Sequence, residues 1–259
     1  MSNKPIGIFD SGVGGTSIFK EIHALLPNEN CMYLADSKNA PYGNKSESEI
    51  LQLSIKNTEF LINKGCKIIV VACNTATTNA ISYLRTHYDI PFIGIEPAIK
   101  PAALKTETKS IGILATKGTL SSHLFHKTTD LYASGIKVIE QVGDGIVPLI
   151  ESGKLESKEM KKLLETYLEP MLAQNIDYLV LGCTHYPYLI PMLTKMLPNN
   201  VKIIDSGLAV AKQTKAVLSA NDLLCESTQQ PTIQLYSNGN VEILNSILDN
   251  KFETSYLDF

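Results

Sequence analysis

The sequence lacks long apolar runs and a large excess of charge of either sign. No apolar run approaches the roughly 18 residues that a membrane-spanning helix needs, and the run at residues 6–9 is too short for a secretory signal. The 23 basic and 26 acidic residues give a formal net charge of −3, which argues against binding to nucleic acid through bulk charge. We therefore expect a cytoplasmic, soluble protein with no membrane or nucleic-acid partner.

Closely spaced cysteines are also missing. The five cysteines are odd in number, lie far apart and form no Cys-x-x-Cys pair: Cys31, Cys66, Cys73, Cys183 and Cys225. This pattern is typical of free thiols in a reducing compartment rather than of a disulfide or zinc framework. His123 and His126 have a metal-like spacing, but no third ligand lies near them, so we expect a solvated helix face and no metal.

Short β-rich apolar runs alternate with longer segments of helical periodicity, in a chain of 259 residues of which 44% are hydrophobic. Strands are predicted at residues 4–9, 31–35, 67–72, 91–95, 110–114, 136–142, 177–182, 201–204 and 232–236. Helices are predicted at 16–26, 47–64, 75–87, 157–174 and about 240–249. Strand–helix alternation favours an α/β fold with parallel sheets, and the length fits one large or two small domains.

A faint internal repeat favours two domains. Residues 6–11 (IGIFDS) match residues 111–116 (IGILAT), residues 70–75 (VVACNT) match 180–185 (VLGCTH), and residues 95–96 match 204–205, in the same order and at nearly one offset. The alternative is that any two parallel strands look alike. We predict two similar α/β domains, one from residues 1–97 with 207–259 and the other from 98–206.

Cys73 and Cys183 occupy equivalent places in this repeat. Each follows an apolar strand and precedes polar residues that open a predicted helix. The carboxyl end of a parallel strand is where ligands bind in α/β proteins, and a helix N-terminus should make a thiol ionise more easily. Asn74 or Thr75 could cap the first helix, and Thr184 the second. A lone cysteine of this kind is more often inert core, but the pairing favours function.

Two thiols facing one ligand from opposite sides suit racemisation. One would remove a proton from the carbon beside a carboxylate while the other returns a proton to the opposite face. His185, two residues after Cys183, could act as its proton relay or charge partner.

A glycine-rich segment, residues 10–16 (DSGVGGT), follows the first strand. A dinucleotide site is disfavoured, because the G-x-G-x-x-G pattern counted from Gly12 fails at Ser17. Asp10 could instead be a carboxylate at the strand tip, or only a cap for the next helix. The turn Pro41-Tyr42-Gly43 could close over a ligand, or be no more than a turn.

Four stretches together resemble the bacterial glutamate racemases, within the cofactor-independent aspartate/glutamate racemase superfamily. They are residues 8–15 (IFDSGVGG), Ala35-Asp36 with Pro41-Tyr42-Gly43, residues 72–76 (ACNTA) and residues 181–187 (LGCTHYP). The resemblance implies two α/β domains related by a pseudo-two-fold axis, with the active site in the cleft between them.

The resemblance also implies roles for particular residues. Cys73 would be the base for D-glutamate, assisted by Asp10, and Cys183 the base for L-glutamate, assisted by His185 and Glu151. The positions that hold substrate would be Ser11, Tyr42, Gly43, Asn74, Thr75, Thr116, Thr119 and Thr184. The family supplies D-glutamate for peptidoglycan and needs neither pyridoxal phosphate nor metal, so we expect no cofactor. We also expect a homodimer.

Three alternatives stay open from the sequence. The chain could be an aspartate racemase of the same superfamily. It could be an amidase with Cys183 as a covalent nucleophile and His185 as its partner. It could also be a two-lobed binding protein without catalysis, although binding alone gives no reason for two matching thiols.

Overall fold

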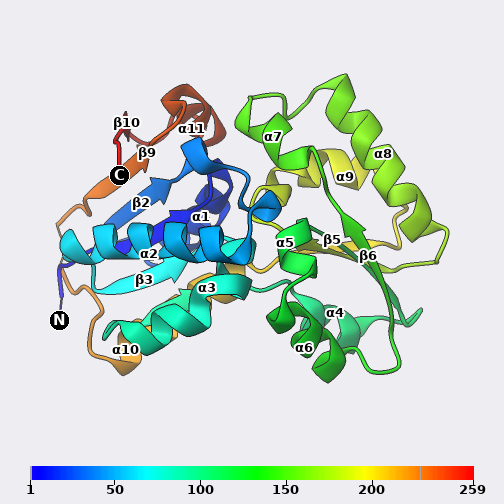
Figure 1. Cartoon of the computed structure of the whole chain (residues 1–259), viewed down its shortest axis with the longest axis horizontal. Helices are drawn as coiled ribbons and strands as arrows, with labels where there is room; N and C mark the ends of the chain where they lie inside the picture. The colour runs from blue at the N-terminus through cyan, green and yellow to red at the C-terminus, as the bar shows by residue number, and fades with distance from the viewer. Residues whose placement is uncertain (1, 228) are drawn as a thin grey trace.

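The computed structural model describes residues 2–227 and 229–259, and contains two parallel β-sheets that lie side by side (Figure 1). The first sheet has six strands in the order β10 (Thr254–Tyr256), β9 (Ile233–Ser237), β2 (Cys31–Ala35), β1 (Ile6–Asp10), β3 (Ile68–Val71) and β4 (Phe92–Gly94). The second has four strands in the order β6 (Lys137–Val142), β5 (Ser110–Ala115), β7 (Tyr178–Gly182) and β8 (Lys202–Ile204). The predicted α/β class with two parallel-sheet domains is confirmed.

The two sheets share one strand order, which accounts for the repeat in the sequence. The order β2-β1-β3-β4 in the first sheet corresponds to β6-β5-β7-β8 in the second. Gly7 of β1 lies opposite Ile69 of β3, and Gly112 of β5 lies opposite Leu179 of β7, so even the register is the same. Equivalent strand ends therefore carry Asp10 and Ala115, or Cys73 and Cys183.

Helices cover both faces of each sheet, as the burial of both faces of a parallel sheet requires. On the first sheet they are α1 (Thr16–Leu25), α2 (Glu47–Asn63), α3 (Asn74–His87), α10 (Gly207–Ala220) and α11 (Val241–Ile247). On the second they are α4 (Ile99–Lys105), α5 (Lys117–Leu120), α6 (His123–Tyr132), α7 (Ile146–Glu151), α8 (Lys158–Leu172) and α9 (Ile190–Met196). Short 3₁₀ turns lie at Val13–Gly15, Ser37–Asn39, Tyr42–Asn44 and Tyr186–Leu189.

Alternate side chains of each strand enter different cores. In β3, Ile68 and Val70 join a core with α1 and α10, while Ile69 and Val71 join a core with α2 and α3. The first of these cores continues across the domain boundary to α7, α8 and α9. The two domains are therefore held together by continuous apolar packing.

The segment after Asp205 lies with the first sheet. Helix α10 packs against α1, and β9 pairs with β2. Strand β10, which the sequence does not predict, pairs with β9 at the edge of the sheet. The residue limits of the two domains stay a prediction.

Among residues 2–227 and 229–259, no helix combines the length and apolar character needed to cross a membrane.

Candidate active site

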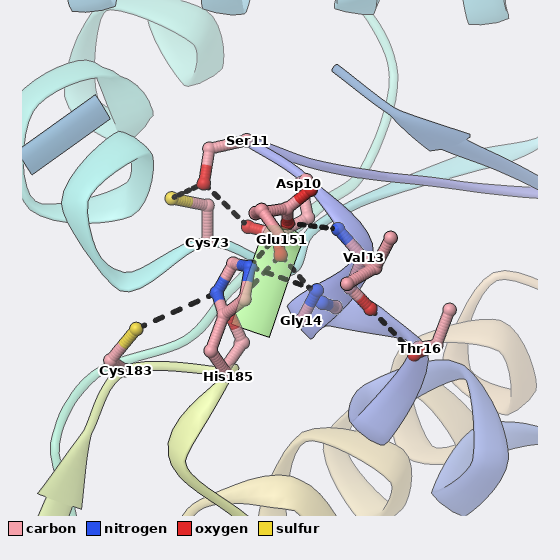
Figure 2. A network of polar contacts seen from close by, with 12 residues as sticks. Asp10, Ser11, Val13, Gly14, Thr16, Cys73, Glu151, Cys183 and His185 are labelled. Atoms are coloured by element: carbon pink, nitrogen blue, oxygen red, sulfur yellow. Dashed lines mark hydrogen bonds and ion pairs between the residues drawn. The ribbon is translucent and has the colours of Figure 1, made fainter. Parts of the chain in front are cut away.

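The carboxyl ends of β1, β3 and β7 converge where the two domains meet, and Figure 2 shows the polar network at this junction. Cys73 lies at the end of β3 and is itself the N-cap of α3, because its Sγ accepts a hydrogen bond from the Ala76 N–H at 3.4 Å. The prediction that Asn74 or Thr75 caps this helix is therefore wrong. The sulfur satisfies the free N–H group, so both polar side chains are released for other contacts.

Cys183 follows β7 but does not open a long helix, contrary to the prediction. A 3₁₀ turn, Tyr186–Leu189, comes first, and α9 begins only at Ile190. Pro191 lacks the backbone N–H group that a helix continuing from Thr184 would need at this position. Thr184 caps nothing either, since its hydroxyl donates to Asp10 Oδ2 at 3.2 Å.

His185 joins Cys183 to Glu151. Its Nδ1 lies 3.7 Å from Cys183 Sγ, and its Nε2 lies 2.6 Å from Glu151 Oε1. Burial by itself lowers the pKa of His185, but the hydrogen bonds and charges of Cys183 and Glu151 outweigh it and raise that pKa well above its ordinary value. Burial raises the pKa of Glu151, and the bond to His185 outweighs it, so that pKa is lowered. The raised pKa of His185 and the lowered pKa of Glu151 both favour an imidazolium that faces a carboxylate.

Asp10 is fully buried at the end of β1. Its Oδ2 accepts from the Gly15 N–H at 2.5 Å and from Thr184, and its Oδ1 accepts from the Ser11 hydroxyl at 3.4 Å. Asp10 is therefore a carboxylate at the strand tip that also binds the turn before α1. The alternative that it only caps the helix is wrong, because the N-cap of α1 is Gly15 and no side chain caps it. Burial raises its pKa, and the nearby His185 opposes that change.

The Cys73 thiol differs from the expectation of easy ionisation. Its pKa lies well above the usual value, first because the sulfur is buried and second because Asp10 is close. Desolvation of a thiolate outweighs the favourable field of the α3 N-terminus in this closed site. Cys73 Sγ contacts the Ser11 hydroxyl at 3.6 Å, and Ser11 in turn donates to Asp10.

The glycine-rich segment makes room for side chains of the other domain. A Cβ on Gly12 would lie 1.9 Å from Glu151 Oε1, and one on Gly14 would lie 2.2 Å from His185 Nδ1. The backbone N–H of Val13 donates to Glu151 Oε1 at 2.7 Å. The glycines therefore serve close domain contact, and the backbone groups that could have held a phosphate hold a carboxylate instead.

Three threonine hydroxyls form a cluster across the domain boundary. Thr75 Oγ1 of α3 lies 2.7 Å from Thr116 Oγ1 and 3.4 Å from Thr119 Oγ1, both from the second domain. The Thr116 hydroxyl also donates to Thr119 at 3.0 Å. The structure brings together, next to Cys73, hydroxyls that are suited to a carboxylate.

Asn74 sits beside Cys73 with its amide unused. The residue is 3% exposed, and neither Nδ2 nor Oδ1 has a hydrogen-bond partner among the described residues. A buried amide without a partner costs free energy, and such groups often mark a place where a ligand supplies the missing bonds.

The turn Pro41-Tyr42-Gly43 covers the cluster from the first domain. A Cβ on Gly43 would lie 2.8 Å from Thr116 Cβ, so the turn packs tightly against the second domain. The Tyr42 hydroxyl donates to Asp36 Oδ2 at 2.5 Å, which fixes the turn to the end of β2. Asp36 is thus an anchor for this turn.

A narrow cavity opens at the same boundary. Its lining includes Pro41 and Gly43 from the first domain and, from the second, Thr116, Lys117, residues 142–145, Val147 and Pro148. Thr116 of the threonine cluster thus lies at its wall. The buried thiols are 4% and 6% exposed, so the site is closed around them.

Two features of the site were not predicted from the sequence. One is the backbone of Val13 and Gly14, which contacts Glu151 and His185. The other is the contact of Thr16 with Tyr188, residues that are 172 positions apart and carry no common motif. His123 and His126 lie outside the site, and both are exposed on α6.

The fold and the site define an enzyme of two parallel α/β domains with one thiol from each placed at their junction. The family model described as Asp/Glu/Hydantoin racemase matches residues 6–214. The chain belongs to the Asp/Glu/hydantoin racemase family, and it is an isomerase of the racemase class.

Similar proteins agree over nearly the whole chain. The chain is 44% identical to a glutamate racemase of Herpetosiphon aurantiacus, across 92% of this chain and 94% of that one. It is 48% identical to that of Pseudomonas entomophila, across 88% and 86%.

Solved structures give the same result. A glutamate racemase isoform from Bacillus anthracis superposes with a TM-score of 0.89 and 29% identity, covering 100% of this chain and 98% of that chain. The Escherichia coli glutamate racemase, in complex with L-glutamate and the activator UDP-MurNAc-Ala, superposes with a TM-score of 0.85 and 33% identity, covering 98% and 97%.

Proposed function

We propose that this protein interconverts L- and D-glutamate without a cofactor. In the proposed reaction one cysteine removes the α-proton of the substrate and the other cysteine returns a proton to the opposite face. The observation that carries the proposal is the equivalent placement of the two thiols, one from each domain. A short chain of contacts connects them: Cys73 Sγ to Ser11, Ser11 to Asp10, and Asp10 to Thr184, the residue after Cys183. In Figure 2 both sulfurs lie at one edge of this network, Cys73 beside Ser11 and Cys183 beside His185.

The proposed reaction from L-glutamate starts at Cys183. Its thiolate, stabilised by the His185 imidazolium, takes the α-proton from one face of the substrate, and the Cys73 thiol gives a proton to the opposite face. In the reverse direction the roles exchange, so Cys73 is the base for D-glutamate. The raised pKa of Cys73 supports its role as the proton donor, because it keeps that thiol protonated before the reaction.

The residues around the thiols suit a dicarboxylic amino acid. The free amide of Asn74 and the hydroxyls of Thr75, Thr116 and Thr119 would bind carboxylate oxygens. The buried Asp10 carboxylate would attract the substrate ammonium group. We assign Ser11, Thr184 and the Pro41-Tyr42-Gly43 turn to the same binding site.

Substrate entry requires the domains to separate. The thiols are buried and the turn at residues 41–43 packs on Thr116, so we infer that the boundary cavity widens to admit glutamate and then closes. Small-angle scattering with and without D-glutamate tests this step, and identical profiles would contradict it.

The direct test is to follow the circular dichroism of D-glutamate after purified, metal-depleted protein is added without a cofactor. We expect the signal of the amino acid to decay to zero, and in D2O the product should acquire α-deuterium. The rate with D-aspartate measures specificity, and a faster rate with D-aspartate would reassign the substrate.

The Cys183–His185 contact also fits a covalent nucleophile, and the intact mass of the protein after quenching with substrate separates the two reactions. A racemase shows no adduct, whereas an amidase shows an acyl-cysteine and does not need Cys73. Binding of glutamate without decay of the optical signal would instead indicate a binding protein.

The cellular role follows from the resemblance to glutamate racemases. We propose that the protein works in the cytoplasm as a homodimer and supplies D-glutamate for peptidoglycan. Analytical ultracentrifugation tests the dimer, and D-glutamate dependence of a deletion strain tests the role.

A further inference from the structure

A hydrogen bond connects the two domains beside the Cys183 half of the site. Thr16, the first residue of α1, has its Oγ1 2.6 Å from the hydroxyl of Tyr188, which lies in the 3₁₀ turn after Cys183. One helical turn further along α1, the Lys20 ammonium lies 5.1 Å from the centroid of the Tyr188 ring. The ring is thus held in place by a cation–π contact, and its hydroxyl is aimed at Thr16.

The direction of this bond follows from the other partner of Thr16. The Thr16 hydroxyl donates its one proton to the Val13 carbonyl at 2.6 Å, a bond drawn in Figure 2. Thr16 Oγ1 can therefore only accept from Tyr188, so the tyrosine hydroxyl is the donor. Phenylalanine at position 188 would keep the ring and lose that donor.

The backbone of Val13 links Thr16 to Glu151 through two hydrogen bonds. Its carbonyl is held by Thr16, and its N–H donates to Glu151 Oε1 at 2.7 Å. The same carboxylate oxygen lies 2.6 Å from His185 Nε2. Position and orientation of the Glu151 carboxylate thus depend on where the Val13 backbone lies.

The geometry at His185 shows which protonation state this arrangement favours. Nε2 is 3.3 Å from the Gly14 N–H, which needs a lone pair, and 2.6 Å from Glu151, which needs a proton. The shorter contact to the carboxylate is the stronger one, so Nε2 carries a proton. The groups that face the ring are Glu151 from α7, Asp10 from β1 and Cys183 beside it, and the first two are acids that favour the imidazolium.

We propose that Tyr188 is a positioning residue for Cys183: through Thr16, Val13 and Glu151 it holds the protonated His185 against the Cys183 sulfur when the domains are closed. This inference rests on the proposed racemase function. It predicts that the bond between the domains, and not only the presence of Glu151, keeps the proton on His185.

The test compares Tyr188→Phe with the unchanged protein. Because the enantiomers have equal free energy in water, kcat/KM must fall equally for L- and D-glutamate, and we expect a fall of about 3–10-fold, the effect of one lost hydrogen bond. The alkaline limb of the pH profile should move to lower pH, since His185 loses its proton more easily. Thr16→Val should behave the same way, and Thr16→Ser, which keeps the hydroxyl, should restore the original profile.

Two controls exclude a merely structural effect. Tyr88→Phe removes a tyrosine hydroxyl that donates to Glu59 Oε1 at 2.9 Å in a solvent-exposed contact of the first domain, and it should leave the pH profile unchanged. In the double variant Tyr188→Phe/Glu151→Gln, the rate should equal that of Glu151→Gln alone, because both changes act through one carboxylate. An unchanged alkaline limb in Tyr188→Phe, or additive losses in the double variant, would overturn the proposal.

A readout that does not need activity separates this inference from the proposed function. The His185 imidazole can be titrated by ¹⁵N NMR, with His185→Gln to assign its signal. A lower His185 pKa in Tyr188→Phe supports the positioning role even if glutamate is not racemised. An equal pKa in the two proteins contradicts that role even if glutamate is racemised.

Discussion

The Cys73 half and the Cys183 half of the site have equivalent backbone positions, but the ionisable groups beside the two sulfurs differ. Cys73 and Cys183 end equivalent strands in sheets of the same order, yet Cys73 lies near the Asp10 carboxylate and Cys183 near the His185 imidazolium. Asp10 raises the pKa of Cys73 and so disfavours its thiolate, whereas Cys183 Sγ contacts the His185 ring. A repeated fold thus sets where two groups lie, while the side chains around each sulfur set its surroundings.

The largest expected effect comes from removing either sulfur. Cys73→Ala and Cys183→Ala should each lower the racemisation rate at least about 100-fold, because each removes a group that transfers a proton. Cys225→Ala, at a half-buried cysteine near Asn3, is the matched control and should change the rate by less than about two-fold. Full activity in either of the first two variants would refute the two-thiol scheme. Circular dichroism of D-glutamate measures all three.

A methyl group on the glycine-rich segment should affect the Cys183 half next. In Gly14→Ala the new Cβ displaces His185, and we expect a loss of about 10–100-fold in kcat from misplacement of this ring. Gly65→Ala provides the contrast, because Gly65 has a φ of +78° and open space around it. That variant should lose about 1–2 kcal/mol of stability and keep its kcat. Equal kcat in the two variants would contradict the close fit at Gly14.

Removing the charge of Glu151 without changing its shape should have a smaller effect, seen mainly in the pH dependence of kcat/KM. Glu151→Gln removes the carboxylate that raises the pKa of His185, so the alkaline limb of kcat/KM should move to lower pH. Loss of about ten-fold in rate is expected above that limb, and less below it. A profile that keeps its alkaline limb would show that another group controls it.

The smallest expected effect is on stability. The pKa of His185 is raised on folding, so its contribution is complete below about pH 6.5 and is lost as pH rises through the folded value. The pKa of Glu151 is lowered, so its contribution is present above about pH 4.3 and is lost as pH falls through the folded value. The difference in melting temperature between the protein and His185→Gln should therefore be largest between these limits, at about 2–4 °C. A difference that grows above pH 6.5 would contradict this sign.

Elements with strong local signals could be predicted from the sequence. The buried run Cys31–Ala35 is a strand with the predicted limits, and α2 starts at Glu47 because Ser46 and Glu49 form a capping box. Strand β10 was missed because its three residues are half-buried or exposed and lack an apolar pattern. The strand predicted at residues 136–142 was found as β6 although none of its residues is fully buried, so it is the run of β-rich apolar residues, absent from β10, that makes a strand predictable.

The site was predictable in its residue types and not in its energetics. The repeat places the two thiols at matching strand ends, but it cannot show that burial raises the pKa of Cys73. It also cannot show that Thr16 meets Tyr188, because that contact depends on how the two domains pack. Quantities that depend on desolvation or on distant segments become visible only in three dimensions.

Because Gly12 and Gly14 have no side chains, the first domain leaves room for Glu151 and His185 of the second domain. The shape of each domain at the boundary therefore depends on the other domain. A hybrid that joins the first domain of this chain to the second domain of another racemase would work only if the donor brought a carboxylate and an imidazole of matching reach. A sequence change at this boundary in one domain therefore requires a matching change in the other domain, although each domain has a complete sheet of its own.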